Sequence, residues 1–507
     1  MYISVTRGAL VVFAAHGRRH HSQTLKRATF LYLLILGLVC ALIFWVLHLG
    51  ASLPAPVGGA VAGASTSVAM ARGGAGTGSA FGAMGDGISQ NLAEPLSHLF
   101  LQLLIIIAAS RLMGKAISAL GQQAVVGEMA AGILLGPSLF GLLAPRAFAY
   151  VFPASSFGTL TLLSQIGVCL FMFAVGMELN VNHVKARAHT ALVVSHASIV
   201  CPYLLGVGLA YFLFSHLAAP GARFTPFALF AGISMSITAF PVLARILQDR
   251  GLSRTELGST AITCAAVGDV TAWIILAFVV AIARATSMAG VALILVLVLL
   301  FIAVMILGVK RALPRWIGAA RLSEDEPSKG TVATVVCVVV ASALCTEMIG
   351  IHALFGAFLA GAVMPDTSGF REKLSVRVEN FSSVLLLPLF FAFTGLRTQI
   401  GLLNDPQGWL ICLAIIAVAT LGKLGGAAIP ARATGMSWSD SLQLGALMNT
   451  RGLMELIALN IGYDLGILPP RIFTMLVIMA LATTAFTGPL LTLFRGKRAS
   501  LAEPAPC

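Results

Sequence analysis

Charged side chains are scarce in this chain: Asp, Glu, Lys and Arg make up only 10% of its 507 residues, whereas hydrophobic residues make up 58%. Soluble domains carry about 25% charged residues, so this composition excludes an ordinary soluble protein and predicts a polytopic membrane protein. The net charge of +13 is spread between apolar segments and forms no basic patch. We therefore expect the lipid bilayer, and no nucleic acid, as a partner.

The chain also lacks the residue clusters of enzymes and metal centres. Its eight cysteines include no C-x-x-C pair, and most fall inside apolar segments, where a thiol behaves as a small hydrophobic group. No nucleophile–base arrangement, phosphate-binding loop or cluster of metal ligands is apparent. We predict that the protein is not an enzyme and needs no cofactor.

Apolar runs long enough to cross a bilayer follow one another along the chain. We predict a basic leader and membrane anchor in residues 1–50, a flexible Gly/Ala/Ser-rich linker in 51–95, a membrane domain in 96–494 and a short cytoplasmic tail in 495–507. The expected spans are 28–50, 96–114, 124–143, 158–177, 190–215, 226–247, 256–283, 286–309, 331–349, 351–365, 382–397, 409–431, 441–461 and 472–494.

The basic residues between these spans predict the orientation of the chain. If the N-terminus lies inside and every span crosses once, most of the 32 Lys and Arg residues fall on the inner side, as the positive-inside rule requires. We expect both termini to be cytoplasmic. This arrangement leaves Arg245, Lys423 and Arg451 inside spans.

Two short motifs occur twice along the chain. Residues 132–137 (GILLGP) match residues 359–365 (LAGAVMP), and residues 170–176 (LFMFAVG) match residues 389–395 (LFFAFTG). The matching spans are an odd number of crossings apart, so the second copy must be inverted. This pattern predicts an all-α membrane fold of two inverted six-helix repeats joined by a linker helix at 286–309, preceded by an extra N-terminal helix. Inverted repeats are typical of secondary transporters.

Asp269 lies near the middle of an apolar run from Leu257 to Ala283. A carboxylate at the centre of a spanning helix costs roughly 2.5–3.5 kcal/mol, which makes it a candidate functional group. Burial also favours its protonated form, so the group is suited to holding and releasing a proton. Lys423 is the cation expected to face Asp269, unless it reaches toward the inner surface instead.

Pro241 predicts a break in the span 226–247, because its ring nitrogen cannot donate to the carbonyl of Ile237 and its ring crowds the preceding turn. The freed carbonyls and the Thr238 hydroxyl would be suitable oxygen ligands for a monovalent cation. The alternative interpretation is a proline kink in a packing helix.

The corresponding span of the second repeat contains Asn449, Thr450, Arg451 and Gly452, where we expect a second break. Arg451 has two candidate roles. It can pair with Glu455 four residues later on the same helical face, or it can compensate the exposed carbonyl end of one of the broken helices.

Taken together, these motifs resemble those of the monovalent cation:proton antiporter-2 family, which includes plant cation/proton exchangers and bacterial potassium-efflux antiporters. The likeness covers about residues 96–494 and rests on residues 126–129, 132–137, 238–247, 265–273, 351–356, 386–396 and 447–459. It implies roughly thirteen core helices with inverted repeats, two crossed broken helices, a homodimer with an elevator-like core, and a place in the bacterial inner membrane. It also implies that Asp269 binds the ion and that Lys423 is the core lysine.

Gly268 departs from the family pattern, in which many relatives carry an acid or an asparagine before the ion-binding acid. Glycine supplies no side-chain ligand, so a transported Na⁺ or K⁺ would be held by Asp269, Thr238, backbone carbonyls and water. With a single titrating carboxylate, we predict electroneutral 1:1 exchange of the cation for a proton. The alternatives are a gated K⁺ channel-like efflux pathway and a non-transporting membrane sensor or assembly subunit.

Overall fold

The computed structural model describes residues 34–53, 94–120, 122, 124–178, 188–253, 255–285, 287–318, 328–366 and 369–494. The predicted leader, most of the predicted linker and the predicted tail lie outside these residues. Within the described residues the chain is helical and contains no β-strand. Among these described residues, eleven helical segments are long and apolar enough to cross a membrane. The predicted all-α polytopic fold is therefore confirmed.

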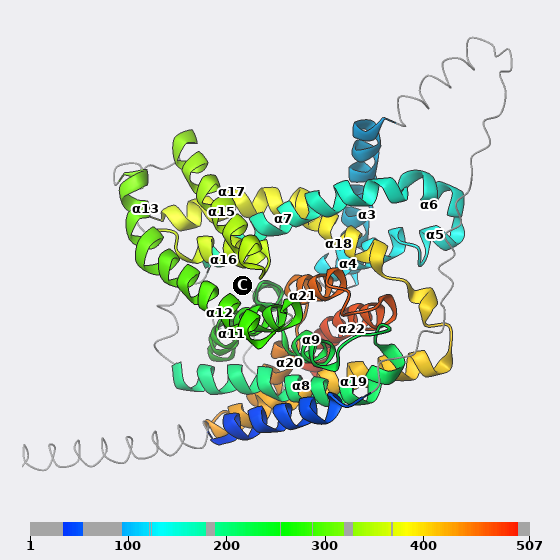
Figure 1. The fold of residues 1–507 in the computed structure, drawn as a ribbon, viewed down its shortest axis with the longest axis vertical. Coiled ribbons are helices and arrows are strands. Elements are labelled where there is room, and N and C mark those ends of the chain that lie inside the picture. The colour runs from blue at the N-terminus through cyan, green and yellow to red at the C-terminus, as the bar shows by residue number, and fades with distance from the viewer. Residues whose placement is uncertain are drawn as a thin grey trace, which may run out of the picture.

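Most helices pack into one of two bundles, which occupy the upper and lower parts of Figure 1. We call the upper one the panel bundle. Its main helices are α3 (Pro95–Ala119), α4 (Ala124–Leu135), α7 (Phe157–Glu178), α15 (Lys329–Ile349), α16 (Ala353–Ala362), α17 (Phe370–Phe381) and α18 (Leu387–Arg397), with the short α5 (Phe140–Leu143) and α6 (Pro145–Val151) at its edge.

The lower bundle, which we call the crossover bundle, contains both interrupted spans. Its helices are α8 (Ala188–Leu217), α9 (Phe224–Ser236), α10 (Phe240–Asp249), α11 (Glu256–Arg284), α19 (Pro406–Ala433), α20 (Trp438–Met448), α21 (Leu453–Asp464) and α22 (Pro470–Phe494).

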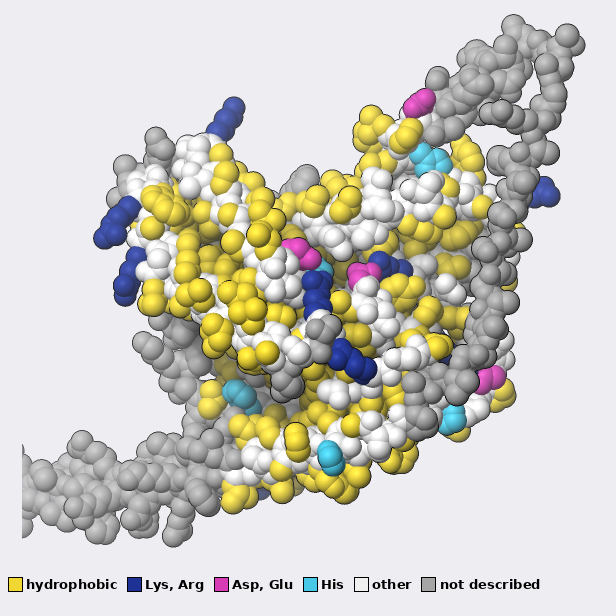
Figure 2. Space-filling model, in the orientation of Figure 1, with side chains coloured by type: hydrophobic (Ala, Val, Ile, Leu, Met, Phe, Trp, Pro, Cys, Tyr) yellow, Lys and Arg dark blue, Asp and Glu magenta, His cyan; other side chains and the backbone are white. Residues whose placement is uncertain are grey.

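A long segment at the left of Figure 1 joins the bundles: α12 (Met288–Ala303), a π-helical stretch (Val304–Val309) and α13 (Lys310–Ile317). It corresponds to the predicted linker helix, and α12 contacts both α11 and α15. Its apolar side chains, such as Leu293, Leu299 and Leu300, are largely exposed, as a lipid-facing helix requires. Hydrophobic side chains also cover most of the face shown in Figure 2, and charged ones gather near a hollow at its centre.

The repeated motifs meet in a crosswise manner inside the panel bundle. α4 packs on α18, and α7 packs on α16, so each helix of the first half contacts the non-equivalent helix of the second half. Glycines form both crossings: Gly132 lies against the backbone of Gly395, and Gly176 lies against that of Gly361, where a Cβ atom would collide. Reciprocal contacts of this kind are what a pseudo-two-fold axis between inverted repeats produces.

Two shorter elements agree with their predicted positions. The N-terminal helix Leu34–Gly50 is apolar, and its residues Ile43, Val46 and Leu47 pack against the core. The short helix expected after Gly350 is α16, which has ten residues. Gly350 adopts a left-handed conformation with φ 96°, which glycine tolerates without a Cβ penalty and which ends α15.

Candidate functional site

The first interruption lies between α9 and α10 of the crossover bundle. α9 ends at Ser236, α10 begins at Phe240, and Ile237 and Ala239 have extended backbone angles. Pro241 stands in the first turn of α10, where the missing N–H would have no helical partner in any case. The structure therefore has the predicted break rather than a kink in a continuous helix.

The second interruption lies between α20 and α21, and it touches the first. α20 ends at Met448 and α21 begins at Leu453, and the Ala239 backbone N–H donates to the carbonyl of Thr450 at 2.9 Å. A Cβ atom at Gly452 would come within 2.9 Å of Val242. Glycine at this position thus allows the two open segments to approach each other.

Arg451 is fully buried at this crossing and holds the end of α9. Its two terminal nitrogens donate to the carbonyls of Ser234 at 2.7 Å and Met235 at 2.6 Å. The same guanidinium lies 3.3 Å from Glu455, which is also fully buried. Arg451 therefore makes both contacts that the sequence suggested: it lies beside Glu455, and it donates to the carbonyl end of the first broken helix, where a positive charge is favourable.

Lys423 on α19 is connected to the carbonyl end of α20 through one intervening side chain. Its ammonium group is fully buried and donates to Thr238 Oγ1 at 2.7 Å. The Thr238 hydroxyl in turn donates to the carbonyl of Met448, the last residue of α20, at 2.9 Å. Lys423 therefore points into the bundle and does not reach toward the inner surface.

Asp269 on α11 is buried, with 2% of its surface exposed. It lines a small cavity beside both interruptions, together with Ile237 of the first break, Met454 at the start of α21, and Ala272, Trp273 and Leu276 of its own helix. The charged side chains close enough to act on the Lys423 ammonium include those of Arg451, Glu455 and Asp269. Two cationic and two acidic side chains thus share the interior of the crossover bundle.

Gly268 faces α8, and the space beside it is occupied by a serine. A Cβ atom at position 268 would lie 3.2 Å from Ser195 Oγ. Ser195 is fully buried and its hydroxyl has no hydrogen-bond partner in the described part of the chain. Sequence reasoning missed Ser195 because a serine within an apolar span has no pattern that separates it from a packing residue.

Asn449 and Thr450 also present buried oxygen atoms at the crossing. Asn449 Nδ2 lies 3.5 Å from the carbonyl of Thr483, whereas Asn449 Oδ1 and Thr450 Oγ1 have no partner among the described residues. Arg245, the third basic residue predicted inside a span, does lie in the apolar segment Phe224–Asp249, on α10, and its side chain is exposed. No group of three or more His, Cys, Asp or Glu residues that could hold a metal ion occurs in the described ranges.

Residues 103–494 match the family model described as sodium/hydrogen exchanger, transmembrane. This chain belongs to the sodium/hydrogen exchanger family. The membership agrees with the predicted likeness to the antiporter-2 family, which is thereby confirmed, and the relatives are transporters rather than enzymes.

The names of this chain's relatives include different cations. The chain is 43% identical over 389 residues to the Na⁺/H⁺ antiporter NhaS4 of Synechocystis sp., covering 76% of this chain and 95% of that protein. It is 39% identical to cation/H⁺ antiporter 17 of Arabidopsis thaliana over 407 residues (78% of this chain, 49% of the relative). It is 32% identical to K⁺/H⁺ antiporter 1 of Saccharomyces cerevisiae over 429 residues (82% and 49%). This chain thus spans about half the length of its plant and yeast relatives.

The fold is also similar to that of a solved exchanger. The structure of the sodium proton antiporter MjNhaP1 from Methanocaldococcus jannaschii aligns with a TM-score of 0.57 and 15% sequence identity, covering 80% of this chain and all of that one. At this identity the likeness describes the helix arrangement. It agrees with the two bundles and the paired interruptions described above.

A pair of substitutions at Thr238 tests the hydrogen-bonded connection from Lys423 through Thr238 to Met448. Thr238→Val removes the acceptor of a buried ammonium and the donor to a helix-end carbonyl, so we expect cation-dependent exchange to weaken by about tenfold or more. Thr238→Ser keeps the hydroxyl and should stay near the parent activity. Exchange measured in proteoliposomes checks both, and equal activity of the Val and Ser variants would contradict this role.

Proposed function

We propose that this chain is a secondary active antiporter that exchanges Na⁺ or K⁺ for H⁺, with Asp269 as the group that binds either the cation or the proton. The observation that carries the proposal is the place of Asp269, a buried carboxylate in a cavity beside two touching helix interruptions. Family membership and the names of the relatives support the reaction class. The names also differ in the cation, so the choice between Na⁺ and K⁺ is a question for transport assays.

Oxygen ligands for the cation would come from several sources around Asp269. Thr238 keeps one lone pair, because its hydroxyl accepts from Lys423 and donates to Met448. The backbone of the first break adds carbonyl oxygens, and Gly268 adds no side-chain ligand. Arg451 and Lys423 lie at the ends of the two broken helices: Arg451 donates to the carbonyl end of α9, and Lys423 reaches that of α20 through Thr238.

Coupling would follow from the apolar surroundings of the Asp269 cavity. Trp273, which lines this cavity, packs edge-on against Phe355 of α16 with ring centroids 5.1 Å apart and stacks on Phe358 at 6.0 Å. An ionised, empty Asp269 would be costly to move past these rings, whereas a protonated or cation-loaded carboxylate would not. Movement would therefore accompany loading with one ion or the other.

The division into two bundles supports an elevator-type movement. Close helix packing occurs mainly within each bundle, and among the described helices the bundles meet chiefly where α22 approaches α4 and through the linking α12. We propose that the crossover bundle moves relative to the panel bundle, which would be the fixed part of a homodimer. The predicted orientation places both termini in the cytoplasm of a bacterial cell and the protein in its inner membrane.

The single acid predicts that exchange is electroneutral, with one cation moving for one proton. In proteoliposomes with a fixed pH gradient, the exchange rate should stay the same when valinomycin and a K⁺ gradient impose a membrane potential, with Na⁺ as the transported ion. A rate that depends on the potential would contradict the 1:1 ratio. A current without stoichiometric proton movement would indicate a channel-like pathway instead.

A further inference from the structure

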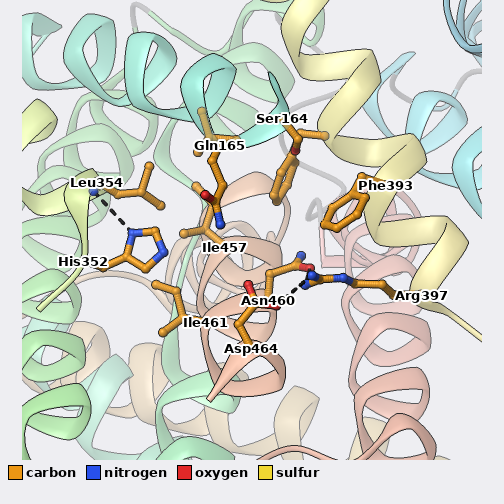
Figure 3. Close-up of a pocket in the computed structure, with 12 residues that line it drawn as sticks. Ser164, Gln165, His352, Leu354, Phe393, Arg397, Ile457, Asn460, Ile461 and Asp464 are labelled. Atoms are coloured by element: carbon orange, nitrogen blue, oxygen red, sulfur yellow. Dashed lines mark hydrogen bonds and ion pairs between the residues drawn. The ribbon is translucent and has the colours of Figure 1, made fainter. Parts of the chain in front are cut away.

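A second cavity lies between the two bundles (Figure 3). Residues of α7, α16 and α18 from the panel bundle line one side, and residues of α21 from the crossover bundle line the other. Its charged and amide side chains include Arg397 at the end of α18 and Asn460 and Asp464 on α21. The proposed binding of the cation and the proton uses none of these three side chains.

Arg397 connects the bundles through its guanidinium group. One terminal nitrogen lies 2.7 Å from Asp464 Oδ1, and the other donates to Asn460 Oδ1 at 2.8 Å. The guanidinium carbon is 4.1 Å from the ring centroid of Phe393 on α18 and 4.9 Å from that of Tyr463 on α21. An aromatic ring from each bundle therefore flanks the same cation, an arrangement that suits the planar, forked guanidinium better than an ammonium group.

Asn460 makes a second connection between the same two helices. Its Nδ2 donates to Thr394 Oγ1 on α18 at 2.9 Å. The Arg397 side chain is only 16% exposed, so its ion pair is partly shielded from water. Asp464 ends α21, and the negative end of that helix adds to the attraction for Arg397. We call Thr394, Arg397, Asn460 and Asp464 the latch.

The latch and the crossing lie at opposite ends of α21. This helix of twelve residues, about 18 Å long, begins directly after Arg451 and Gly452 and carries Glu455, the partner of Arg451, in its first turn. Its C-terminal end carries Asp464. The latch therefore joins α21 to the panel bundle, and α21 is the helix whose other end lies at the crossing.

We infer that Arg397 and Asp464 are positioning residues of the exchange cycle: their pair holds the crossover bundle against the panel bundle in one end state and opens each time the bundles move. This inference rests on the proposed exchange by relative movement. In the predicted orientation the latch lies toward the outer face, so it closes the outer end of the interface between the bundles.

A distance measurement tests the latch without relying on transport. Bio-orthogonal spin labels would replace Leu162 on α7 and Leu421 on α19, both of which are exposed, and report the separation of the bundles. Arg397→Gln should add or enlarge a second distance population. The control is Arg471→Gln, because Arg471 also pairs with a carboxylate, that of Asp405 at 2.5 Å, but within the crossover bundle; the Arg471 side chain is 36% exposed, against 16% for Arg397. Identical distributions in the parent and the Arg397 variant would overturn the inference.

A reversible cross-link tests whether the latch must open during exchange. Cysteines replacing Arg397 and Asp464 would be joined by a short bis-methanethiosulfonate reagent, and exchange should stop on bridging and return after reduction. Cysteines replacing Arg471 and Asp405, bridged in the same way, should leave exchange running, as should the reagent on the parent chain. Persistent exchange in the bridged latch, or an equal block in the control pair, would contradict the proposed opening.

The two tests separate this inference from the proposed function. A parent chain that moves no cation against a pH gradient in these vesicles would count against the antiporter, and the distance measurement would still decide whether the latch restrains the bundles. In an active parent, Arg397→Gln, Asp464→Asn and the double variant should change the maximal rate to the same extent, within about twofold, because each removes the same pair. Independent, multiplying effects would overturn the pairing.

Discussion

Asp269→Asn is expected to abolish exchange of either Na⁺ or K⁺ for protons, while the protein still inserts and folds. The amide has nearly the shape of the carboxylate but neither binds a proton reversibly nor offers a negative charge to a cation. A neutral asparagine is also less costly to bury in the membrane than an ionised aspartate, so the substitution should not prevent folding. We therefore expect loss of transport with a melting temperature and gel-filtration profile close to those of the parent.

The control for this variant is Asp249→Asn, which changes an exposed aspartate at the end of α10. It should exchange like the parent in the same proteoliposomes. Proton-coupled cation movement that survives in Asp269→Asn would refute the assignment of Asp269 as the shared binding group. A folded parent that moves no monovalent cation would instead favour a sensor or assembly subunit.

Arg451→Met is expected to destabilise the fold more than any other single change at the crossing. The substitution leaves Glu455 buried without its partner and leaves the carbonyls of Ser234 and Met235 without their donors. Removing one member of a buried ion pair costs about 3–5 kcal/mol. We expect a large fall in the thermal stability of the detergent-solubilised protein, with much of the chain lost to aggregation.

The double variant Arg451→Met/Glu455→Met separates the two parts of this effect. It removes the stranded carboxylate, so part of the stability should return, but the α9 carbonyls remain unpaired and recovery should be incomplete. Arg471→Met, which breaks a pair with both side chains more than a third exposed, should cost about 1 kcal/mol or less. If Arg451→Met and Arg471→Met unfold at the same temperature, Arg451 does not hold the crossing together.

Much of the fold could be predicted because each signal is local. A spanning helix requires an apolar run, and the runs from the third to the ninth expected span agree with helical segments of the structure. Pro241 predicts its break because a proline cannot continue the hydrogen bonding of the helix before it. The second break lacks proline, and its prediction rested on the position of Asn449, Thr450 and Gly452 in the matching repeat.

The sequence predicts which residues form the candidate site, but it does not predict which residues they contact. Asp269, Lys423 and Arg451 are conspicuous because charges inside apolar spans are costly. Their contacts run between helices far apart in the chain, such as Lys423 with Thr238 or Arg451 with Ser234. No periodicity within one helix specifies such partners, since they depend on how the two inverted halves cross.

Ser195 and the latch show where reasoning from the sequence ends. Ser195 is an ordinary residue of an apolar helix until α8 lies against Gly268. In the sequence, Arg397 is only a basic residue at the end of a predicted span. Its contacts with Asp464 and Asn460 arise because α18 lies beside α21 in the folded protein.

The sequence by itself determined that this chain is a membrane protein and which segments are helical. It also determined where two spans are interrupted and which charges inside spans are candidates for function. All of these follow from the cost of placing polar groups in hydrocarbon. Only the tertiary structure decided which carbonyl end each cation neutralises, what fills the space beside Gly268, and how the two bundles are held together. Those contacts join residues up to 217 positions apart. They exist only after the two halves of the chain have packed against each other.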